Sequence, residues 1–200
     1  MNALTETKEL YTYYDRETWD DNLRWELIDG EAFCMSPGPS EEHQALSGKL
    51  FFELYGYFRD KECRVYAAPF DVLLPGRDDS GKSVGDEIDT VVQPDIVILC
   101  DSSKLRHSGI MGAPDVVFEI LSPSTIGRDL NEKLYLYERS GVLEYLVVDP
   151  FRQTVTAWRR SADSRSPGRF SRREIYEKND TLEFETFEEL KIPLRSVFAR

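Results

Sequence analysis

Two carboxylates interrupt apolar segments in which β-strands are expected. Asp95 opens the run DIVILC, and Glu119 lies in the middle of DVVFEILS, on the same strand face as Val117 and Leu121. A glutamate in a strand centre runs against β propensity, and burying its charge unpaired would cost several kcal/mol. Each carboxylate therefore needs a basic residue, a backbone donor or a metal ion beside it. Because local rules fail most often at functional sites, these two residues are the first candidates.

Carboxylates on two neighbouring strands would make a hard-oxygen site suited to Mg²⁺ or Mn²⁺. Such an ion polarises a phosphoryl oxygen and lowers the pKa of a bound water. Lys133 is the candidate third member, on the helix expected after the Glu119 strand, with Asp129 four residues earlier on the same helix face. Three plainer interpretations stay open: Glu119 as a salt-bridged core carboxylate, Asp95 as a cap at the strand start, and Asp129–Lys133 as a surface ion pair.

Three further polar residues have a structural and a functional interpretation. His43 borders the apolar stripe of the first long helix, either as a hydrogen-bonded helix histidine or at the mouth of the site. Asp71, in PFDVLLP, is interpreted as an edge-strand residue rather than a supporting acid. Tyr137 is one turn beyond Lys133 and is expected to pack rather than react.

The elements that must position these residues follow a simple order. WELIDGEAFCMSP predicts a β-hairpin around Asp29-Gly30, and Ser40 is the expected N-cap of a helix that runs to about Phe58. Its apolar stripe is Leu46, Leu50, Leu54 and Tyr57. Strands then follow in three segments: CRVYAAPFDVLLP, VVQPDIVILCD and DVVFEILSPS. They are separated by two expected loops, one over Gly76 to Thr90 and one over SSKLRHSGIMGAP.

The rest of the chain adds a helix, a buried strand and a late hairpin. Ser124 or Thr125 is the expected cap of a helix over about Gly127 to Arg139, which Gly141 stops. VLEYLVVDP is a buried strand, TVTAWRR and FSRREIYEKND form a hairpin, and the tail ends in a short helix and an amphipathic stub. This order predicts an α/β (α+β) sandwich around a mixed sheet, with an N-terminal hairpin and C-terminal β additions.

Composition excludes several classes of protein. The chain of 200 residues is long enough for one domain with a real core, and 31% charged residues fit a soluble globular chain. No apolar run is long enough to span a membrane, and the first twenty residues hold no signal-peptide core. The three cysteines, Cys34, Cys63 and Cys100, show neither zinc spacing nor a disulfide framework. We expect each to be a small buried residue in a reducing cytoplasm.

The net charge of -12 argues against broad electrostatic binding of nucleic acid. The last fifty residues are the exception, with 11 basic against 8 acidic residues. A solvated hairpin is one interpretation of this excess, and contact with a phosphate backbone is the other. The basic residues concerned are Arg159, Arg160, Arg165, Arg169, Arg172 and Arg173.

The segments PDIVILCD, APDVVFEILSPST and RDLNEKLYLYERSGVLEYLVVDP resemble the Uma-two family of putative restriction endonucleases. WELIDGEAFCMSPGPSEEHQALSGKL resembles the N-terminal signature of that family, so the similarity covers about residues 20–150. The family belongs to the PD-(D/E)xK nuclease superfamily, whose core runs helix, three strands, helix, strand. The resemblance therefore implies a restriction-endonuclease-like fold, in agreement with the element order above.

The resemblance also assigns roles to individual residues. Asp95, after Pro94, matches the first metal ligand, Glu119 matches the second acid, and the carbonyl of Ile120 matches the usual backbone ligand. The superfamily lysine would stand two residues after Glu119, where this chain has Leu121. The resemblance implies a lysine that has moved to the next helix, where it matches Lys133, and a histidine in the first helix that matches His43.

The first hypothesis is an enzyme, a Mg²⁺- or Mn²⁺-dependent endonuclease that hydrolyses phosphodiester bonds in DNA with Asp95, Glu119 and Lys133. The second is a catalytically inactive binding or scaffold protein with the same fold, favoured by Leu121 and by the acidic composition. A metal-dependent hydrolase acting on another phosphate substrate is the third. Under the first hypothesis the C-terminal arginines are the expected phosphate contacts, and DNA binding should be weak and sensitive to salt.

We expect residues 1–200 to form a single domain, with a core over about 20–150 and the hairpin and tail over 151–200. The expected location is the cytoplasm, with no membrane contact. Because nucleases that cut both strands often act as symmetric dimers, a homodimer is expected, and an exposed edge strand or apolar patch would support it.

Overall fold

Two six-stranded mixed sheets organise the chain in a computed structural model that describes residues 9–20, 22–35, 38–76, 88–160 and 168–199. The first sheet has the order β2-β1-β5-β4-β8-β7, with bounds Glu31–Cys34, Trp25–Ile28, Thr90–Val92, Asp71–Leu74, Gly109–Met111 and Leu105–Arg106. The second has the order β12-β11-β10-β9-β6-β3, with bounds Phe170–Glu177, Thr154–Arg160, Glu144–Asp149, Val116–Ile120, Ile96–Leu99 and Arg64–Ala67. The pairs β4–β8 and β9–β10 are parallel, and the others are antiparallel.

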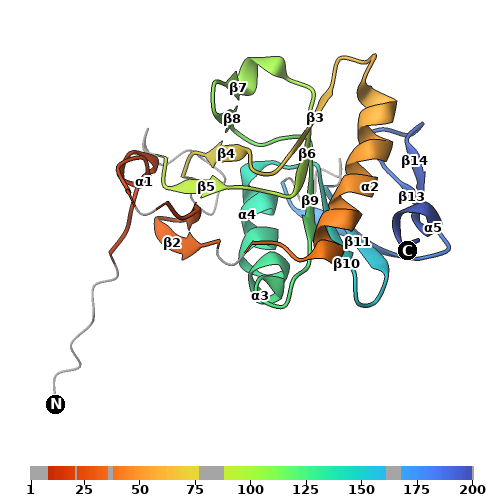
Figure 1. Ribbon diagram of the computed structural model, residues 1–200. Coiled ribbons are helices and arrows are strands. Elements are labelled where there is room, and N and C mark those ends of the chain that lie inside the picture. The colour runs from red at the N-terminus through yellow and green to blue at the C-terminus, as the bar shows by residue number, and fades with distance from the viewer. Residues whose placement is uncertain (1–8, 21, 36–37, 77–87, 161–167, 200) are drawn as a thin grey trace.

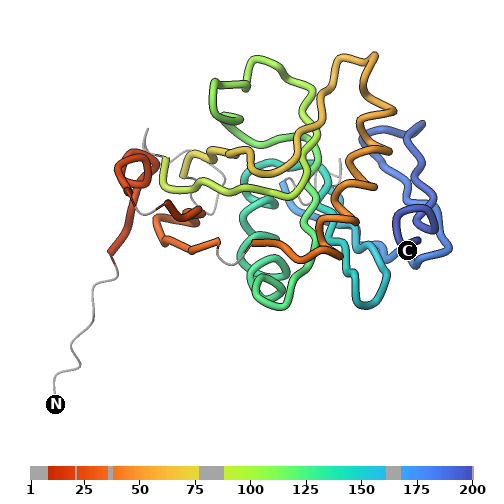
Figure 2. Tube along the Cα trace, in the orientation of Figure 1, coloured from red at the N-terminus to blue at the C-terminus, as the bar shows by residue number. Residues whose placement is uncertain are grey.

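The helices and a small third sheet complete the described structure. The helices are α1 (Tyr13–Arg16), α2 (Glu41–Phe58), η1 (Ser102–Lys104), α3 (Ile126–Leu130), α4 (Glu132–Ser140) and α5 (Leu194–Val197). The third sheet pairs β13 (Thr181–Glu183) with β14 (Lys191–Pro193). Figure 2 follows the chain from the red N-terminal hairpin to the blue C-terminal elements. The mixed α+β class, the N-terminal hairpin and the C-terminal β additions are therefore confirmed.

Side chains that alternate along the strands of the second sheet pack into two hydrophobic cores, one on each face. On β9, Val116, Phe118 and Ile120 pack toward α2 and the C-terminal elements, while Val117 packs toward α4 and the first sheet, as Leu121 does just beyond the strand. Figure 1 shows β6 and β9 between α2 on one side and α4 on the other. Because both faces are covered, the strands are apolar on almost every residue, as the sequence suggested.

Helix α2 begins where its sequence predicts. The Ser40 side chain accepts a hydrogen bond from the His43 backbone at 3.2 Å, which satisfies one unpaired amide of the first turn. Leu46, Leu50 and Leu54 are buried as predicted. The fourth stripe position is Phe58, not Tyr57, because a spacing of four residues continues to the end of the helix.

The predicted helix over Gly127 to Arg139 is two helices. Asn131 has φ -125° and ψ -77°, outside the helical region, and it separates α3 from α4. Thr125 precedes α3 but makes no capping hydrogen bond through its side chain. Gly141 ends α4 in the left-handed conformation, with φ 102°, as the sequence predicted.

Two loop and tail predictions were incomplete. The segment SSKLRHSGIMGAP contains η1, β7 and β8 rather than a plain loop, and the tail forms β13 and β14 before its short helix. These strands are short and pair with distant or turn-connected partners, so local patterning gave little signal for them. Most of the expected loop over Gly76 to Thr90 lies outside the described residues.

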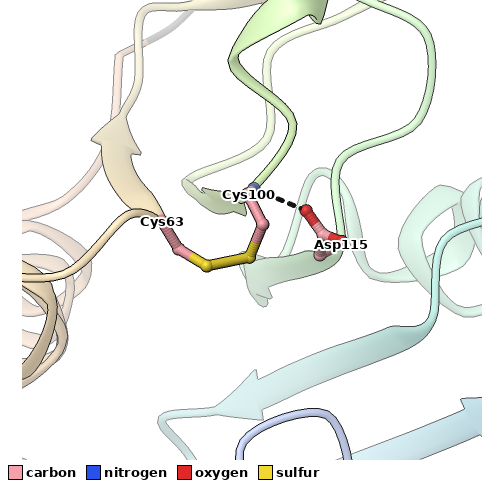
Figure 3. The surroundings of a disulfide bond; sticks show 3 residues. All are labelled: Cys63, Cys100 and Asp115. Atoms are coloured by element: carbon pink, nitrogen blue, oxygen red, sulfur yellow. Dashed lines mark hydrogen bonds between the residues drawn. A yellow bond between two sulfur atoms is a disulfide. The ribbon is translucent and has the colours of Figure 1, made fainter.

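Cys63 and Cys100 form a disulfide, shown in Figure 3, so the expectation of unpaired cysteines was wrong for this pair. The antiparallel register of β3 and β6 pairs Arg64 with Leu99, which places the two cysteines opposite each other just beyond these strands. They are 37 residues apart in sequence, and only strand pairing brings them together. Cys34 is free but exposed, so the prediction that it is buried was also wrong.

No helix in the described ranges is long and apolar enough to cross a membrane.

Candidate active site

Asp95 and Glu119 lie at the same end of two neighbouring strands. The antiparallel register pairs Ile96 of β6 with Phe118 of β9, so the next position along brings Asp95 opposite Glu119. The Asp95 carboxylate also accepts a hydrogen bond from the backbone amide of Ile120 at 2.7 Å. The sheet therefore holds the two predicted acids and the Ile120 backbone together, and Asp95 is more than a strand-start cap.

Lys133 reaches this end of the sheet from α4. Its ammonium donates to Glu119 Oε1 at 2.8 Å and to Glu26 Oε1 at 2.9 Å, and it lies 3.9 Å from Asp129 Oδ1. All four side chains are buried, with exposed fractions of 0 to 4%. The interpretation of Asp129–Lys133 as a surface ion pair is therefore wrong, because both side chains are buried. The interpretation of Glu119 as a salt-bridged core carboxylate agrees with its contact to Lys133.

A further layer of hydrogen bonds fixes these carboxylates. The Tyr137 hydroxyl donates to Glu119 Oε1 at 2.8 Å, so Tyr137 both packs and orients an acid. The Gln93 backbone amide donates to Glu26 Oε1, and the Gln93 side chain donates to Asp71, each at 2.8 Å. Asp71 lies on β4, an interior strand of the first sheet, so its interpretation as an edge-strand residue was wrong.

His43 lies next to Asp95 at the start of α2. Its Nε2 is 3.2 Å from Asp95 Oδ2, while its Nδ1 is buried and has no partner among the described residues. Burial by itself lowers the pKa of His43, but the hydrogen bond and charge of Asp95 outweigh it, so the pKa lies above its usual value. The His43 ring is therefore held against the Asp95 carboxylate.

The buried cluster of Glu26, Glu119, Asp129 and Lys133 carries more negative than positive charge. Burial raises the pKa of Glu119 well above its usual value and that of Asp129 to about 6, although the Lys133 charge opposes both shifts. Burial would lower the pKa of Lys133, but the carboxylates of Glu119, Glu26 and Asp129 raise it above its usual value. Lys133 is therefore held in its charged form.

The donor chemistry of this cluster fits a divalent cation. Three carboxylates against one ammonium leave a formal charge of two negative units when all are ionised, and Glu26 Oε2 and Asp129 Oδ1 are buried with no hydrogen-bond partner among the described residues. Mg²⁺ and Mn²⁺ prefer such carboxylate and carbonyl oxygens. In the described ranges, no three or more His, Cys, Asp or Glu side chains are grouped as a ready metal cage.

The site opens into a cavity of about 580 Å³. Its walls come from the β1–β2 hairpin, the start of α2, the turn at Ala68-Pro69, and the segment from the end of β9 through α3. Asp95, Glu119, Lys133 and His43 all line it, as does the Ile120 position. A substrate entering this cavity would meet every residue that the sequence assigned to the site.

The C-terminal arginines do not line this cavity in the described part of the chain. Arg159 is buried and donates to Glu144 at 2.8 Å, so the expectation that it contacts phosphate was wrong. Arg169 pairs with Glu138 at 3.0 Å, and Arg172 pairs with Glu174 and Glu185. Arg165 lies outside the described residues.

Sequence reasoning missed two charged residues of the site, Glu26 and Arg128. Glu26 stands between apolar residues in the strand WELI, which is the same signal that identified Glu119. Arg128 lies on α3, where a single arginine near Asp129 gave no distinctive signal. Its guanidinium lies 4.1 Å from the centre of the Phe33 ring and 3.9 Å from Glu26 Oε2.

Comparison with known proteins gives consistent matches across most of the chain. The model of the Uma2 family, described as "Putative restriction endonuclease", matches residues 10–195. An uncharacterized protein of Synechocystis sp. is 22% identical over 148 residues, which is 72% of each chain. The crystal structure of a putative nuclease belonging to DUF820 from Anabaena variabilis superposes with a TM-score of 0.66 at 20% identity. That match covers 87% of this chain and 89% of the other, and it shows that the two share a fold.

Proposed function

The chain belongs to the Uma2 family of putative restriction endonucleases, and we propose that it is a Mg²⁺- or Mn²⁺-dependent endonuclease that hydrolyses phosphodiester bonds in DNA. The observation that carries the proposal is the meeting of Asp95, Glu119 and Lys133 at one cavity. Two strands and a helix bring them there although they are far apart in sequence. Such convergence of acids and a buried lysine is what phosphoryl transfer by a metal-assisted hydrolase requires.

Asp95, Glu119 and the Ile120 carbonyl would hold the cation. When bound, a divalent cation polarises a phosphoryl oxygen and lowers the pKa of water. Lys133 would position the attacking water and stabilise negative charge, because the carboxylates around it keep it protonated. His43 would steady Asp95 through its contact with Oδ2, which makes it a positioning residue.

The proposal is tested by Asp95→Ala and Glu119→Ala, with Asp60→Ala as a matched control. Asp60 carries the same charge, but its side chain is 83% exposed at the far end of α2. Cleavage of plasmid and duplex oligonucleotides is followed with Mg²⁺, with Mn²⁺ and with a chelator, and circular dichroism checks the fold. Each site variant should lose divalent-dependent cleavage by a factor of about 100 or more, while the control retains it. Cleavage that survives both site variants refutes the assignment.

One observation favours an inactive binding protein of the same fold as the second candidate. Leu121 stands at the usual lysine position and is 4% exposed in the core beside α4, so this position supplies no charged side chain to the site. Calorimetric titration with Mn²⁺ separates the two candidates. Binding that Asp95→Ala abolishes supports the nuclease, whereas no binding to the folded wild type supports the inactive protein.

We also propose a homodimer in the cytoplasm. The outer face of α2 exposes Phe52 at 74% and Tyr55 at 53%, which is the kind of apolar patch expected of a dimer surface. Sedimentation of the wild type and of Phe52→Glu tests the assembly, and a monomeric wild type contradicts it.

In the cytoplasm, Cys63 and Cys100 would be exposed to reducing conditions. A cytoplasmic protein must therefore fold with both cysteines reduced, and the folding of the reduced protein tests this location.

A further inference from the structure

We propose that Arg128 binds the phosphate group of the substrate inside the cavity. This inference rests on the proposed function, since it names the residue by which the same site recognises a phosphodiester. Neither the sequence motif nor the metal-binding carboxylates account for such recognition. The acids alone would repel a phosphate.

The setting of Arg128 leaves its donors available. One face of the guanidinium covers the Phe33 ring at 4.1 Å, which fixes the orientation of the group without using its N–H bonds. Within the described part of the chain, its one charged contact is Glu26 Oε2 at 3.9 Å, too long for a hydrogen bond. The side chain is 21% exposed and forms part of the cavity wall, so a substrate in the cavity can reach it.

Two of the other cationic groups near the acids already contact carboxylates. Lys133 donates hydrogen bonds to Glu119 and Glu26, and its side chain is only 4% exposed. The His43 Nε2 is taken up by Asp95. Among the described residues, Arg24 and Arg128 are the two arginines of the cavity wall. Arg24 is exposed just before β1, whereas Arg128 is half-buried against Phe33 and near Glu26. A guanidinium held beside the acids in this way matches two phosphate oxygens with paired donors.

Uncharged hydroxyl groups on the same wall of the cavity could add hydrogen-bond donors to a phosphate bound by Arg128. Ser122, Ser124 and Thr125 line the cavity just before α3, and Ser122 Oγ lies 3.0 Å from both Ser124 Oγ and Thr125 Oγ1. A hydroxyl that turns toward a bound phosphate adds a donor without adding charge. The guanidinium would then provide the attraction, and the hydroxyls would refine the position.

The test compares Arg128→Gln and Arg128→Lys with Arg106→Gln. Arg106 lies on β7, the edge strand at the opposite end of the first sheet from β2, and Arg106→Gln removes the same charge. Binding of a labelled DNA duplex is measured by fluorescence anisotropy in a chelator, so that no cleavage occurs, over a range of NaCl concentrations. Circular dichroism confirms that each variant is folded.

Arg128→Gln should weaken binding by about tenfold or more and reduce the slope of log K against log salt by about 0.9, the value for one lost phosphate contact. Arg128→Lys should keep the slope but bind less tightly, because lysine is a point charge. Arg106→Gln should change little.

If wild type binds and cleaves DNA but Arg128→Gln matches it in affinity and slope, only this inference is overturned. If Arg128→Gln does not fold, unchanged binding by Arg128→Lys overturns it. If wild type neither binds nor cleaves DNA, the proposed function is overturned as well.

Discussion

At the scale of single residues, Lys133 is the central ion-pair partner of the buried acids in the site. It is buried with three carboxylates around it, and two of them accept its hydrogen bonds at 2.8 and 2.9 Å. A buried ion pair of this kind adds little net stability compared with an apolar pair, but removing one partner leaves uncompensated charge in a low-dielectric interior. Lys133 should therefore matter to folding as much as to chemistry.

Lys133→Met is expected to lower the free energy of unfolding by about 3 kcal/mol or more, because it removes the ammonium that Glu26, Glu119 and Asp129 share and leaves only Arg128, 3.9 Å from Glu26, as a nearby cation. Denaturant titration at neutral pH measures the loss. Adding Glu119→Gln to Lys133→Met should restore part of the stability, since one of the unpaired charges is then removed.

The exposed pair Lys191–Glu183, 2.7 Å apart, supplies the control. Lys191→Met removes the same charge at side chains that are 58% and 56% exposed, where water screens the pair, so stability should change little. Equal effects of Lys133→Met and Lys191→Met would contradict the importance of burial. A fully additive double variant would contradict the coupling between Lys133 and Glu119.

At this scale the sequence anticipated the acids better than their partners. Asp95 and Glu119 were conspicuous because a charge within an apolar strand breaks a local pattern. Glu26 carried the same local signal as Glu119 and was overlooked, whereas Arg128 had no local signal, because its role depends on contacts with Phe33 and Glu26 of the distant hairpin. The role of each residue as ligand, positioning group or phosphate anchor stays a prediction.

At the scale of elements, the pairing of β6 with β9 and with β3 decides where the acids lie. Asp95 lies immediately before β6, and Cys100, just beyond the other end of β6, forms a disulfide with Cys63, just before β3. The covalent link closes a segment of 37 residues that includes β4 and β5 of the first sheet. It therefore fixes the pairing of two neighbouring strands of the second sheet, at the end of β6 away from Asp95.

Removing this link with Cys63→Ala and Cys100→Ala together should lower the free energy of unfolding by about 3 to 4 kcal/mol, because the unfolded chain regains the entropy of that loop. Calorimetry of the oxidised wild type and the double variant measures the difference. A reductant should lower the wild-type Tm and leave the double variant unchanged. Cys34→Ser removes the free, exposed cysteine and is the control. A wild-type Tm that is insensitive to the reductant would contradict the prediction.

Elements with strong local signals were predicted well, and those defined by distant partners were not. The Ser40 cap and the leucine spacing identified α2, and the Asp29-Gly30 turn identified the hairpin. The break at Asn131 and the short strands β7 and β8 escaped, since no glycine or proline marks the first and the others exist only by pairing within the first sheet.

For the whole molecule, the net charge of -12 is the feature that a DNA-binding role must overcome. Three of the C-terminal arginines are already engaged within the fold, because Arg159 is buried and Arg169 and Arg172 are paired with glutamates. The buried acids at the cavity add to the repulsion. Arg24 and Arg128 are the arginines of the cavity wall among the described residues, and a bound cation, as proposed, would add positive charge there.

Divalent cations should therefore strengthen DNA binding by this protein, although they usually weaken protein–DNA complexes by competing for phosphates. In a chelator the duplex should bind weakly, and Mg²⁺ or Ca²⁺ should raise the affinity above that in NaCl of equal ionic strength, because the ion offsets the charge of Asp95 and Glu119. Fluorescence anisotropy measures this before cleavage is detectable on gels. The double variant Asp95→Asn, Glu119→Gln removes the proposed ligands, and in it the same ions should only weaken binding. If divalent cations weaken DNA binding by the wild type as much as by the double variant, no cation bridges the protein and the DNA at this site. The negative charge of Asp95 and Glu119 would then remain unbalanced when DNA binds.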